Sequence, residues 1–171
     1  LLVPEACPTQ VGWDLQTGDP SIVIGYCDTG VRVTHEDLLL NRQEAYNVVD
    51  GLWGSQGGAI DPIHPHGTWV TDCGSGNGDN GVGISGVGWN LGHRMLRVTN
   101  STSGSASLSN LQAGARTSIE NGDKVASVSY SGVDSASNLS TATYIKSIGG
   151  LLVWAGGNDA ANLALDDRDA D

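Results

Sequence analysis

The stretch VIGYCDTGVRVTHEDL, residues 23–38, begins with apolar and β-branched residues and runs into Asp28-Thr29-Gly30. Pro20 precedes the apolar run and Gly30 follows it, so the pattern predicts a buried β-strand over residues 21–28. Asp28 is then a carboxylate at the carboxyl end of a strand. It has a catalytic interpretation, in which it orients another side chain, and a structural one, in which it closes a turn.

The rest of the chain alternates between helical and strand patterns. Helices are expected over 66–76, 105–122 and 135–150, and further strands over 93–98, 124–130 and 151–158. The middle helix has apolar residues at helical spacing, with Ser107 or Ser109 as its N-cap and Gly122 at its end. Nearly continuous apolar strands separated by helices predict an α/β fold, a doubly wound, mostly parallel sheet with helices on both faces.

Functional side chains of such sheets gather beyond the carboxyl ends of the strands. Asp28, Ser129 and Asn158 all follow predicted strands, so we expect them at one edge of the sheet. The clusters of Gly, Ser, Asn and Asp at 51–60, 74–83 and 100–107 are expected to form surface loops.

Composition narrows the class of protein. The 171 residues are 39% hydrophobic and suffice for one domain with a core, and no apolar run approaches the ~20 residues of a membrane span. The net charge is −11, with 15 Asp, which argues against nucleic acid and anionic membranes as partners. Residues 1–14 lack the features of a signal peptide, so a secreted protein would be a processed form.

The three cysteines, Cys7, Cys27 and Cys73, leave at least one thiol without a partner in this chain. Cys27 lies within the first predicted strand and is interpreted as a small buried apolar residue.

Three kinds of site are possible for the segments that contain Asp28 and His66. Aspartic proteases use two DTG aspartates on an all-β scaffold, whereas this chain has one DTG and an α/β pattern. His66-Gly67-Thr68 follows Asp28 by 38 residues and predicts an imidazole beside the carboxylate, the base half of a Ser-His-Asp triad. His64-Pro65-His66, with Asp61 nearby, is also an HxH pattern that transition metals use, while His35 and His93 stand alone.

The last predicted strand ends in Gly156-Gly157-Asn158. The Asn158 amide could donate a hydrogen bond to a developing oxyanion. The alternative is an asparagine that favours the turn after a strand.

Taken together and in order, these stretches resemble the subtilisin-like serine proteases, the subtilase family. VIGYCDTGVRVTHEDL resembles the family's Asp block, HPHGTWV its His block, VSYSG its substrate-lining strand and VWAGGND its Asn block. GVGISGVGWNLGHRMLRV resembles the loop and strand that follow the His helix. The likeness runs from about Glu5 to Asp159 and implies a secreted serine endopeptidase with peptide or protein substrates.

The resemblance implies a role for each matching residue. Asp28 resembles the triad carboxylate, His66 the general base and later acid, and Asn158 the oxyanion side chain. The substrate cleft would have one wall at Ser129, Tyr130 and Ser131 and an opposite wall at Ala155, Gly156 and Gly157. Ser103, Gly104 and Ser105 fall where the family pairs an edge strand with the peptide backbone.

The serine nucleophile is the main departure from the family. It belongs to a GTSMA-like block beyond the Asn block, and residues 159–171 contain no serine. TSGSASL precedes the Asn block and fits the cleft-edge loop better. Residues 1–171 are therefore expected to be the N-terminal portion of one catalytic domain, truncated before the nucleophile helix and inactive alone, with a C-terminal remainder supplying the serine. The alternative is a non-catalytic, subtilase-like domain that binds peptides.

The resemblance also implies a structural calcium ion, Ca²⁺. Asp37 matches a carboxylate ligand, Asn80 would bind through its side-chain oxygen, and Gly78 and Val82 would offer backbone carbonyls. Oxygen ligands in a flexible loop suit calcium better than a transition metal. Asp79 is expected to be solvated, and the alternative interpretation of the loop is a polar, glycine-rich turn.

Overall fold

The computed structural model describes residues 9–158, with side chains from residue 12 onward. Its six strands are β1 (Val23–Asp28), β2 (Tyr46–Asn47), β3 (Leu52–Trp53), β4 (Gly92–Arg97), β5 (Val125–Val128) and β6 (Leu151–Trp154). Its α-helices are α1 (Thr9–Leu15), α2 (His66–Ser75), α3 (Leu108–Glu120) and α4 (Ala136–Ser147), and two short 3₁₀ helices are η1 (Glu36–Leu38) and η2 (Gly54–Gln56).

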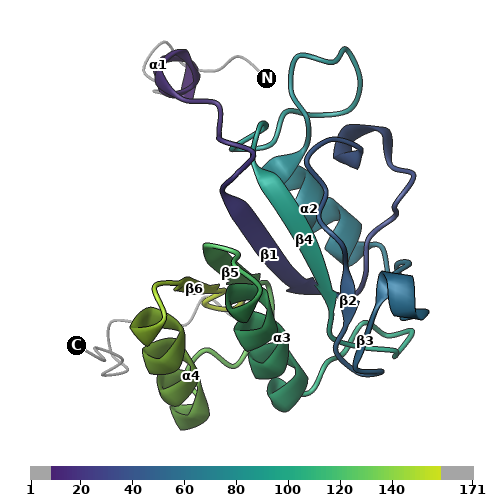
Figure 1. The fold of residues 1–171 in the computed structure, drawn as a ribbon, viewed down its shortest axis with the longest axis vertical. Helices are drawn as coiled ribbons and strands as arrows, with labels where there is room; N and C mark the ends of the chain where they lie inside the picture. The colour runs from purple at the N-terminus through teal and green to yellow at the C-terminus, as the bar shows by residue number, and fades with distance from the viewer. Residues whose placement is uncertain (1–8, 159–171) are drawn as a thin grey trace.

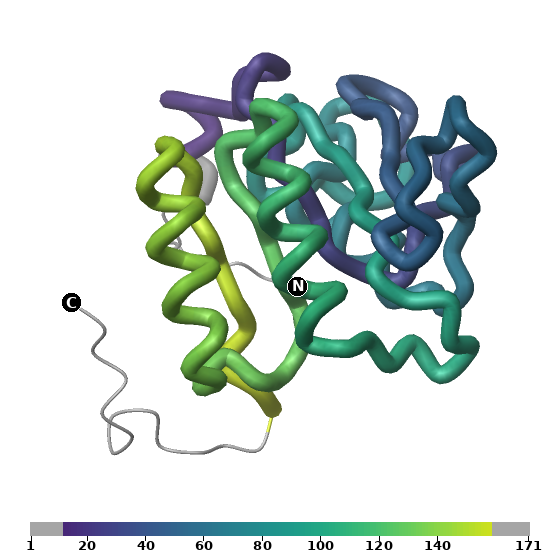
Figure 2. Tube along the Cα trace, turned by 60° about the horizontal axis from the view of Figure 1, so that its bottom comes forward, coloured from purple at the N-terminus to yellow at the C-terminus, as the bar shows by residue number. Residues whose placement is uncertain are grey.

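The strands form one sheet in the order β3-β2-β4-β1-β5-β6. Every neighbouring pair is parallel except β2 and β3, which are antiparallel. Helices α3 and α4 lie side by side on one face, while α2 lies on the other (Figures 1 and 2). The predicted α/β fold, with a mostly parallel sheet and helices on both faces, is confirmed.

Alternating side chains of the strands divide the core in two. Cys27 and Leu96 point toward α3 and α4 and join a cluster with Leu111 and Ile145. Their neighbours Tyr26 and Met95 point toward α2 and join a second cluster. The interpretation of Cys27 as a buried apolar residue holds, since the side chain is 1% exposed.

Helix α3 shows how the local sequence sets its bounds. The Ser107 hydroxyl accepts a hydrogen bond from the backbone N–H of Asn110 (3.2 Å) and so caps the first turn. Leu111, Ala115 and Ile119 recur at helical spacing and bury the same face against the sheet. Gly122, at φ 93°, provides the left-handed residue after the helix.

The second half of the sheet is covered on one face. Leu152 and Trp154 of β6 pack against the α3 and α4 cluster. Leu151 and Val153 point the other way and are 57% and 48% exposed. Helix α2, on the face to which Leu151 and Val153 point, contacts β1 and β4, and β5 lies between these strands and β6.

Two polar groups are buried in the sheet. Arg94 of β4 donates to both carboxylate oxygens of Asp123 (2.9 and 3.1 Å), and the Ser118 hydroxyl donates to the same carboxylate (2.8 Å). His93, also of β4, is 1% exposed, and neither of its ring nitrogens has a hydrogen-bond partner. Burial lowers the pKa of His93 to about 4, and the positive charge of Arg42 contributes to this shift.

No helix in the described range combines the length and the apolar character that crossing a membrane requires. Cys73 is exposed, and Cys7 lies outside the described residues.

Candidate active site

Asp28 and His66 meet where strand β1 ends and helix α2 begins. The ring Nδ1 of His66 lies 2.9 and 3.0 Å from the two carboxylate oxygens of Asp28. A carboxylate accepts hydrogen bonds, so Nδ1 carries the proton and donates it, which leaves the lone pair of a neutral imidazole on Nε2. Asp28 is buried and also accepts from the Thr29 backbone N–H (2.8 Å), while the His66 side chain remains 40% exposed.

Thr29 fixes the approach of α2 to β1. Its hydroxyl donates to the carbonyl of His64 (2.7 Å) and accepts from the backbone N–H of Gly67 (2.9 Å). The hydrogen bond from Gly67 gives a partner to a backbone N–H in the first turn of α2, where Pro65 provides no side-chain cap.

Glycine is required at position 67. A Cβ there would lie 3.0 Å from the Thr29 nitrogen and 3.1 Å from the Asp28 Cβ, and would overlap the Gly30 carbonyl. The absence of a side chain at Gly67 therefore allows α2 to begin directly beside Asp28.

His66 opens onto a hollow of about 390 Å³ at the carboxyl edge of the sheet. The hollow is lined by Thr29, His64, His66, Ser103, Gly104, Ser129, Tyr130, Ser131, Ala155, Gly157 and Asn158. The carboxyl ends of β1, β5 and β6 thus meet at one hollow, as the sequence predicted from the positions of Asp28, Ser129 and Asn158.

Tyr130 spans the hollow between two of its walls. Its hydroxyl donates to the carbonyl of Gly104 (2.8 Å), and its ring lies edge-on to the ring of His66, with centroids 6.3 Å apart. Burial, reinforced by the negative charge of Asp28, raises the pKa of the Tyr130 phenol. The phenol therefore stays protonated and can donate this hydrogen bond at neutral pH.

Most of the residues expected to bind substrate gather at this hollow. The two exceptions are Gly156, which is absent from its lining, and Ser105, which lines a second hollow of about 370 Å³ beside Leu108 and Leu111. Thr29 and His64 line the first hollow and were not selected from the sequence. The sequence indicated both residues only by position: Thr29 directly follows Asp28, and His64 lies two residues before His66.

The alternative HxH metal site is not formed. His66 Nδ1 is held by Asp28, and His64 Nδ1 accepts from the His66 backbone N–H (3.2 Å). Among residues 9–158, the group of His, Cys, Asp and Glu side chains whose ligand atoms converge is His35, Asp37 and Asp72.

The loop expected to bind calcium lies against Asp37. The Asn80 amide donates to one oxygen of the buried Asp37 carboxylate (2.9 Å), and the Ile84 N–H donates to the other (2.8 Å). Gly78 packs against the ring of Trp89. The Asn80 amide oxygen accepts from the Val82 N–H (3.1 Å), so Asn80 would have to turn its amide by half a turn to offer this oxygen to a calcium ion beside Asp37.

Comparison with known proteins places this geometry in a family. A family model described as "Subtilase family" matches residues 19–169. The chain belongs to the subtilase family. As a subtilase, it carries its Asp and His residues in the order that the sequence blocks indicated.

One protein is similar in sequence, and two solved structures are similar in fold. The subtilase chain is 26% identical over 166 residues to a thermophilic serine proteinase of Bacillus sp. (strain AK1), covering 95% of this chain and 39% of the relative. It shares its fold with the prenylagaramide maturation protease PagA, at TM-score 0.67 and 20% identity, covering 92% of this chain and 52% of the other. The CspB protease of Clostridium perfringens gives TM-score 0.64 and 23% identity, with 85% and 37% coverage. The chain therefore spans about two fifths to half the length of these relatives.

Proposed function

We propose that the chain contributes the Asp-His half of a serine endopeptidase active site, which hydrolyses peptide bonds in peptide or protein substrates. The observation that carries the proposal is the contact between Asp28 and His66 Nδ1 at 2.9 Å, beside a hollow that can receive a peptide. Family membership supports serine peptidase chemistry, and the acidic surface supports an extracellular setting.

In the proposed mechanism, Asp28 holds His66 in the tautomer with the proton on Nδ1. Nε2 then takes the proton of a serine hydroxyl as that oxygen attacks the scissile carbonyl, and later gives the proton to the leaving amine. Asp28 stays ionised and stabilises the imidazolium that forms between these two steps. Its burial and its second hydrogen bond, from the Thr29 N–H, keep it in place.

The walls of the hollow supply binding and charge stabilisation. The Asn158 amide would donate to the oxyanion of the tetrahedral intermediate. The segments around Gly104 and Ser129 would pair with the peptide backbone. Calcium, held by Asp37, Asn80 and the carbonyls of Gly78 and Val82, would have a structural role away from the reacting atoms.

The serine is proposed to lie in polypeptide outside residues 1–171, since this chain spans 39% of the length of the serine proteinase relative. Residues 1–171 alone would then be inactive. The proposal is tested by labelling with a serine-directed fluorophosphonate, first on residues 1–171 alone and then with the polypeptide that completes the domain.

We expect labelling in the complete protein and its loss in His66→Ala, while Lys146→Ala, a change at an exposed side chain of α4, keeps it. Peptide binding to the complete protein without labelling or cleavage would instead favour a non-catalytic peptide-binding domain. Labelling of residues 1–171 alone would contradict the origin proposed for the serine.

A further inference from the structure

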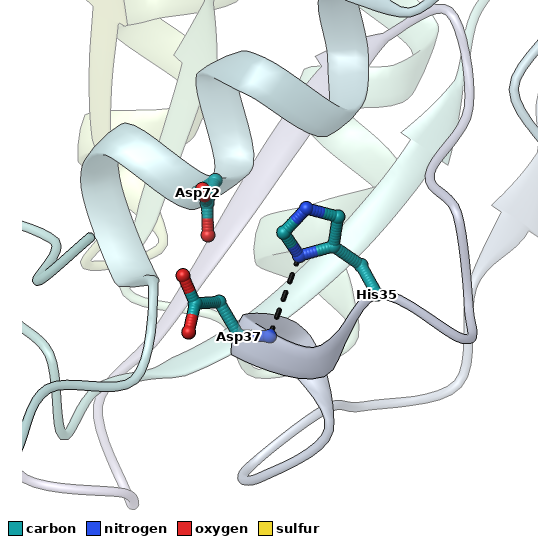
Figure 3. Close-up of side chains that lie close together, drawn as sticks. All are labelled: His35, Asp37 and Asp72. Atoms are coloured by element: carbon teal, nitrogen blue, oxygen red, sulfur yellow. Dashed lines mark hydrogen bonds between the residues drawn. The ribbon is translucent and has the colours of Figure 1, made fainter. Parts of the chain in front are cut away.

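His35, Asp37 and Asp72 form a cluster apart from the hollow described above. Their ligand atoms all lie within 4.8 Å of one another. His35 and Asp37 belong to the start of η1, while Asp72 projects from α2 (Figure 3). The cluster therefore joins the segment after β1 to the helix that begins with His66.

Asp72 has a buried oxygen without a partner. Its Oδ1 is shielded from solvent, and no group in the described residues donates a hydrogen bond to it. An unsatisfied, buried carboxylate oxygen is costly, and an ordered water or a bound ion would satisfy it. Burial raises the pKa of Asp72, and the facing charge of Asp37 adds to this rise.

Asp37 brings a second carboxylate to the same place. It is 0% exposed, and its partners are the neutral amide of Asn80 and the neutral N–H of Ile84. Within the described residues, the ion pairs join His66 to Asp28 and Arg94 to Asp123, so no Lys or Arg neutralises Asp37 or Asp72. Two carboxylates held close together, with His35 as their basic neighbour and no Lys or Arg, attract a cation.

His35 decides which cation fits. Its Nδ1 accepts a weak hydrogen bond from the Asp37 N–H (3.3 Å), so in neutral histidine Nδ1 carries the lone pair, and a bound metal would take the place of this hydrogen bond. An imidazole nitrogen beside two carboxylates suits a first-row transition metal, whereas calcium and magnesium prefer oxygen ligands alone. Ligands of one zinc ion lie about 3.4 Å apart for bonds of about 2.0–2.1 Å, so side-chain rotations would close the cluster around the metal.

We propose that His35, Asp37 and Asp72 bind a divalent transition metal, of which zinc is the representative, and that this metal clamps η1 to α2. Asp28 ends the strand that leads to η1, and His66 begins α2. The clamp therefore stabilises the spacing between the two elements that carry the Asp-His pair. The inference does not depend on peptidase activity, because it concerns binding and stability.

The proposed metal is distinct from the proposed calcium ion, although both use Asp37. Calcium would lie on the side of Asn80 and need neither His35 nor Asp72. The two sites are therefore separated by variants: His35→Gln and Asp72→Asn should remove the response to transition metals and leave the response to calcium.

The test uses the complete protein in a Cys73→Ser background, which removes this exposed thiol as a competing ligand. Metal-free protein is titrated with Zn²⁺ while the melting temperature is recorded, and with Co²⁺ while its visible absorption is recorded. We expect one Co²⁺ per chain with ligand-field absorption, and a rise in melting temperature of about 5–10 °C at a hundredfold excess of Zn²⁺ over Kd. The matched control is Asp79→Asn, an exposed acidic residue in the neighbouring loop.

Asp72→Asn and His35→Gln should each weaken Co²⁺ binding by at least about tenfold, whereas Asp79→Asn should not. Asp72→Asn also removes charge repulsion, so its metal-free melting temperature should equal or exceed that of the parent. Loss of metal binding in this variant is then not a consequence of unfolding. Equal Zn²⁺ and Co²⁺ responses in all three variants, or no response in the parent, would overturn the proposal.

Discussion

His93 should make the stability of this protein depend on pH. The imidazole is 1% exposed, has no hydrogen-bond partner on either nitrogen, and has a pKa of about 4 in the folded chain. In the unfolded chain the pKa returns to about 6.5. The unfolded state therefore binds more protons between these values, and stability falls as the pH is lowered from 6.5 to 4.

The size of the effect follows from the two pKa values. A difference of about 2.5 units corresponds to about 3.4 kcal/mol once the pH is below both values. Between pH 7 and pH 5, the loss in the free energy of unfolding is about 2 kcal/mol. With a urea dependence of about 2 kcal/mol per M, the unfolding midpoint should fall by about 1 M over that range.

The assay is urea unfolding at pH 7, 6 and 5 at constant ionic strength. His93→Leu replaces the imidazole with an apolar side chain of similar size and should remove about 2 kcal/mol of the pH dependence. His64→Gln, which removes a partly exposed histidine, should keep the full pH dependence. If His93→Leu and the parent lose stability in parallel between pH 7 and pH 5, protonation of His93 is not the cause.

Four further outcomes test the site and its support. In the complete protein, Asp28→Asn should lower kcat for peptide hydrolysis by roughly 10⁴-fold with KM little changed, which is the size of this effect in triad proteases in general, subtilases among them. Thr29→Val keeps the shape but leaves two backbone groups unpaired, so the free energy of unfolding should fall by about 1–3 kcal/mol, and an unchanged urea midpoint would contradict the role given to its hydroxyl. Arg94→Met should lower the free energy of unfolding by about 3–5 kcal/mol, because it leaves the buried Asp123 carboxylate without its ion-pair partner. In the same assay, the double variant Arg94→Met/Asp123→Leu should recover much of that loss. Calcium added to metal-free protein should raise the melting temperature, and a response that persists in Asn80→Ala would count against the loop as its ligand.

The sequence predicted the elements whose patterns are long. Helix α3 begins after Ser107 and is followed by Gly122 in the left-handed region, as its spacing and end signals indicated. Strand 93–98 was predicted one residue out of place, and the other three strands were predicted two to four residues too long. The longest excess, residues 155–158, is the glycine-rich turn after β6.

Short and non-local features were missed. Strands β2 and β3 have two residues each, too few to show alternation, and β3 falls within a segment predicted to be a loop. The contact between Asp28 and His66 was expected from motif order. The double hydrogen bond of Thr29 and the convergence of Asp72 on Asp37 and His35 depend on how α2 lies across β1, which no local pattern encodes.

The position of β1 in the sheet has a consequence for the timing of folding. Among the described strands it comes first in the chain, yet it lies between β4 and β5, with Val23 opposite Gly92 and Ile24 opposite Val125. At about 5–20 residues per second, the ribosome needs about 5–20 s to extend the chain from β1 to β5. Until β4 has been made, both edges of β1 lack their final partners, and the edge that will pair with β5 stays open for the whole interval. The nascent strand is therefore open to mispairing. The segment that carries Asp28 should thus be the part of the chain that most needs a chaperone while translation continues.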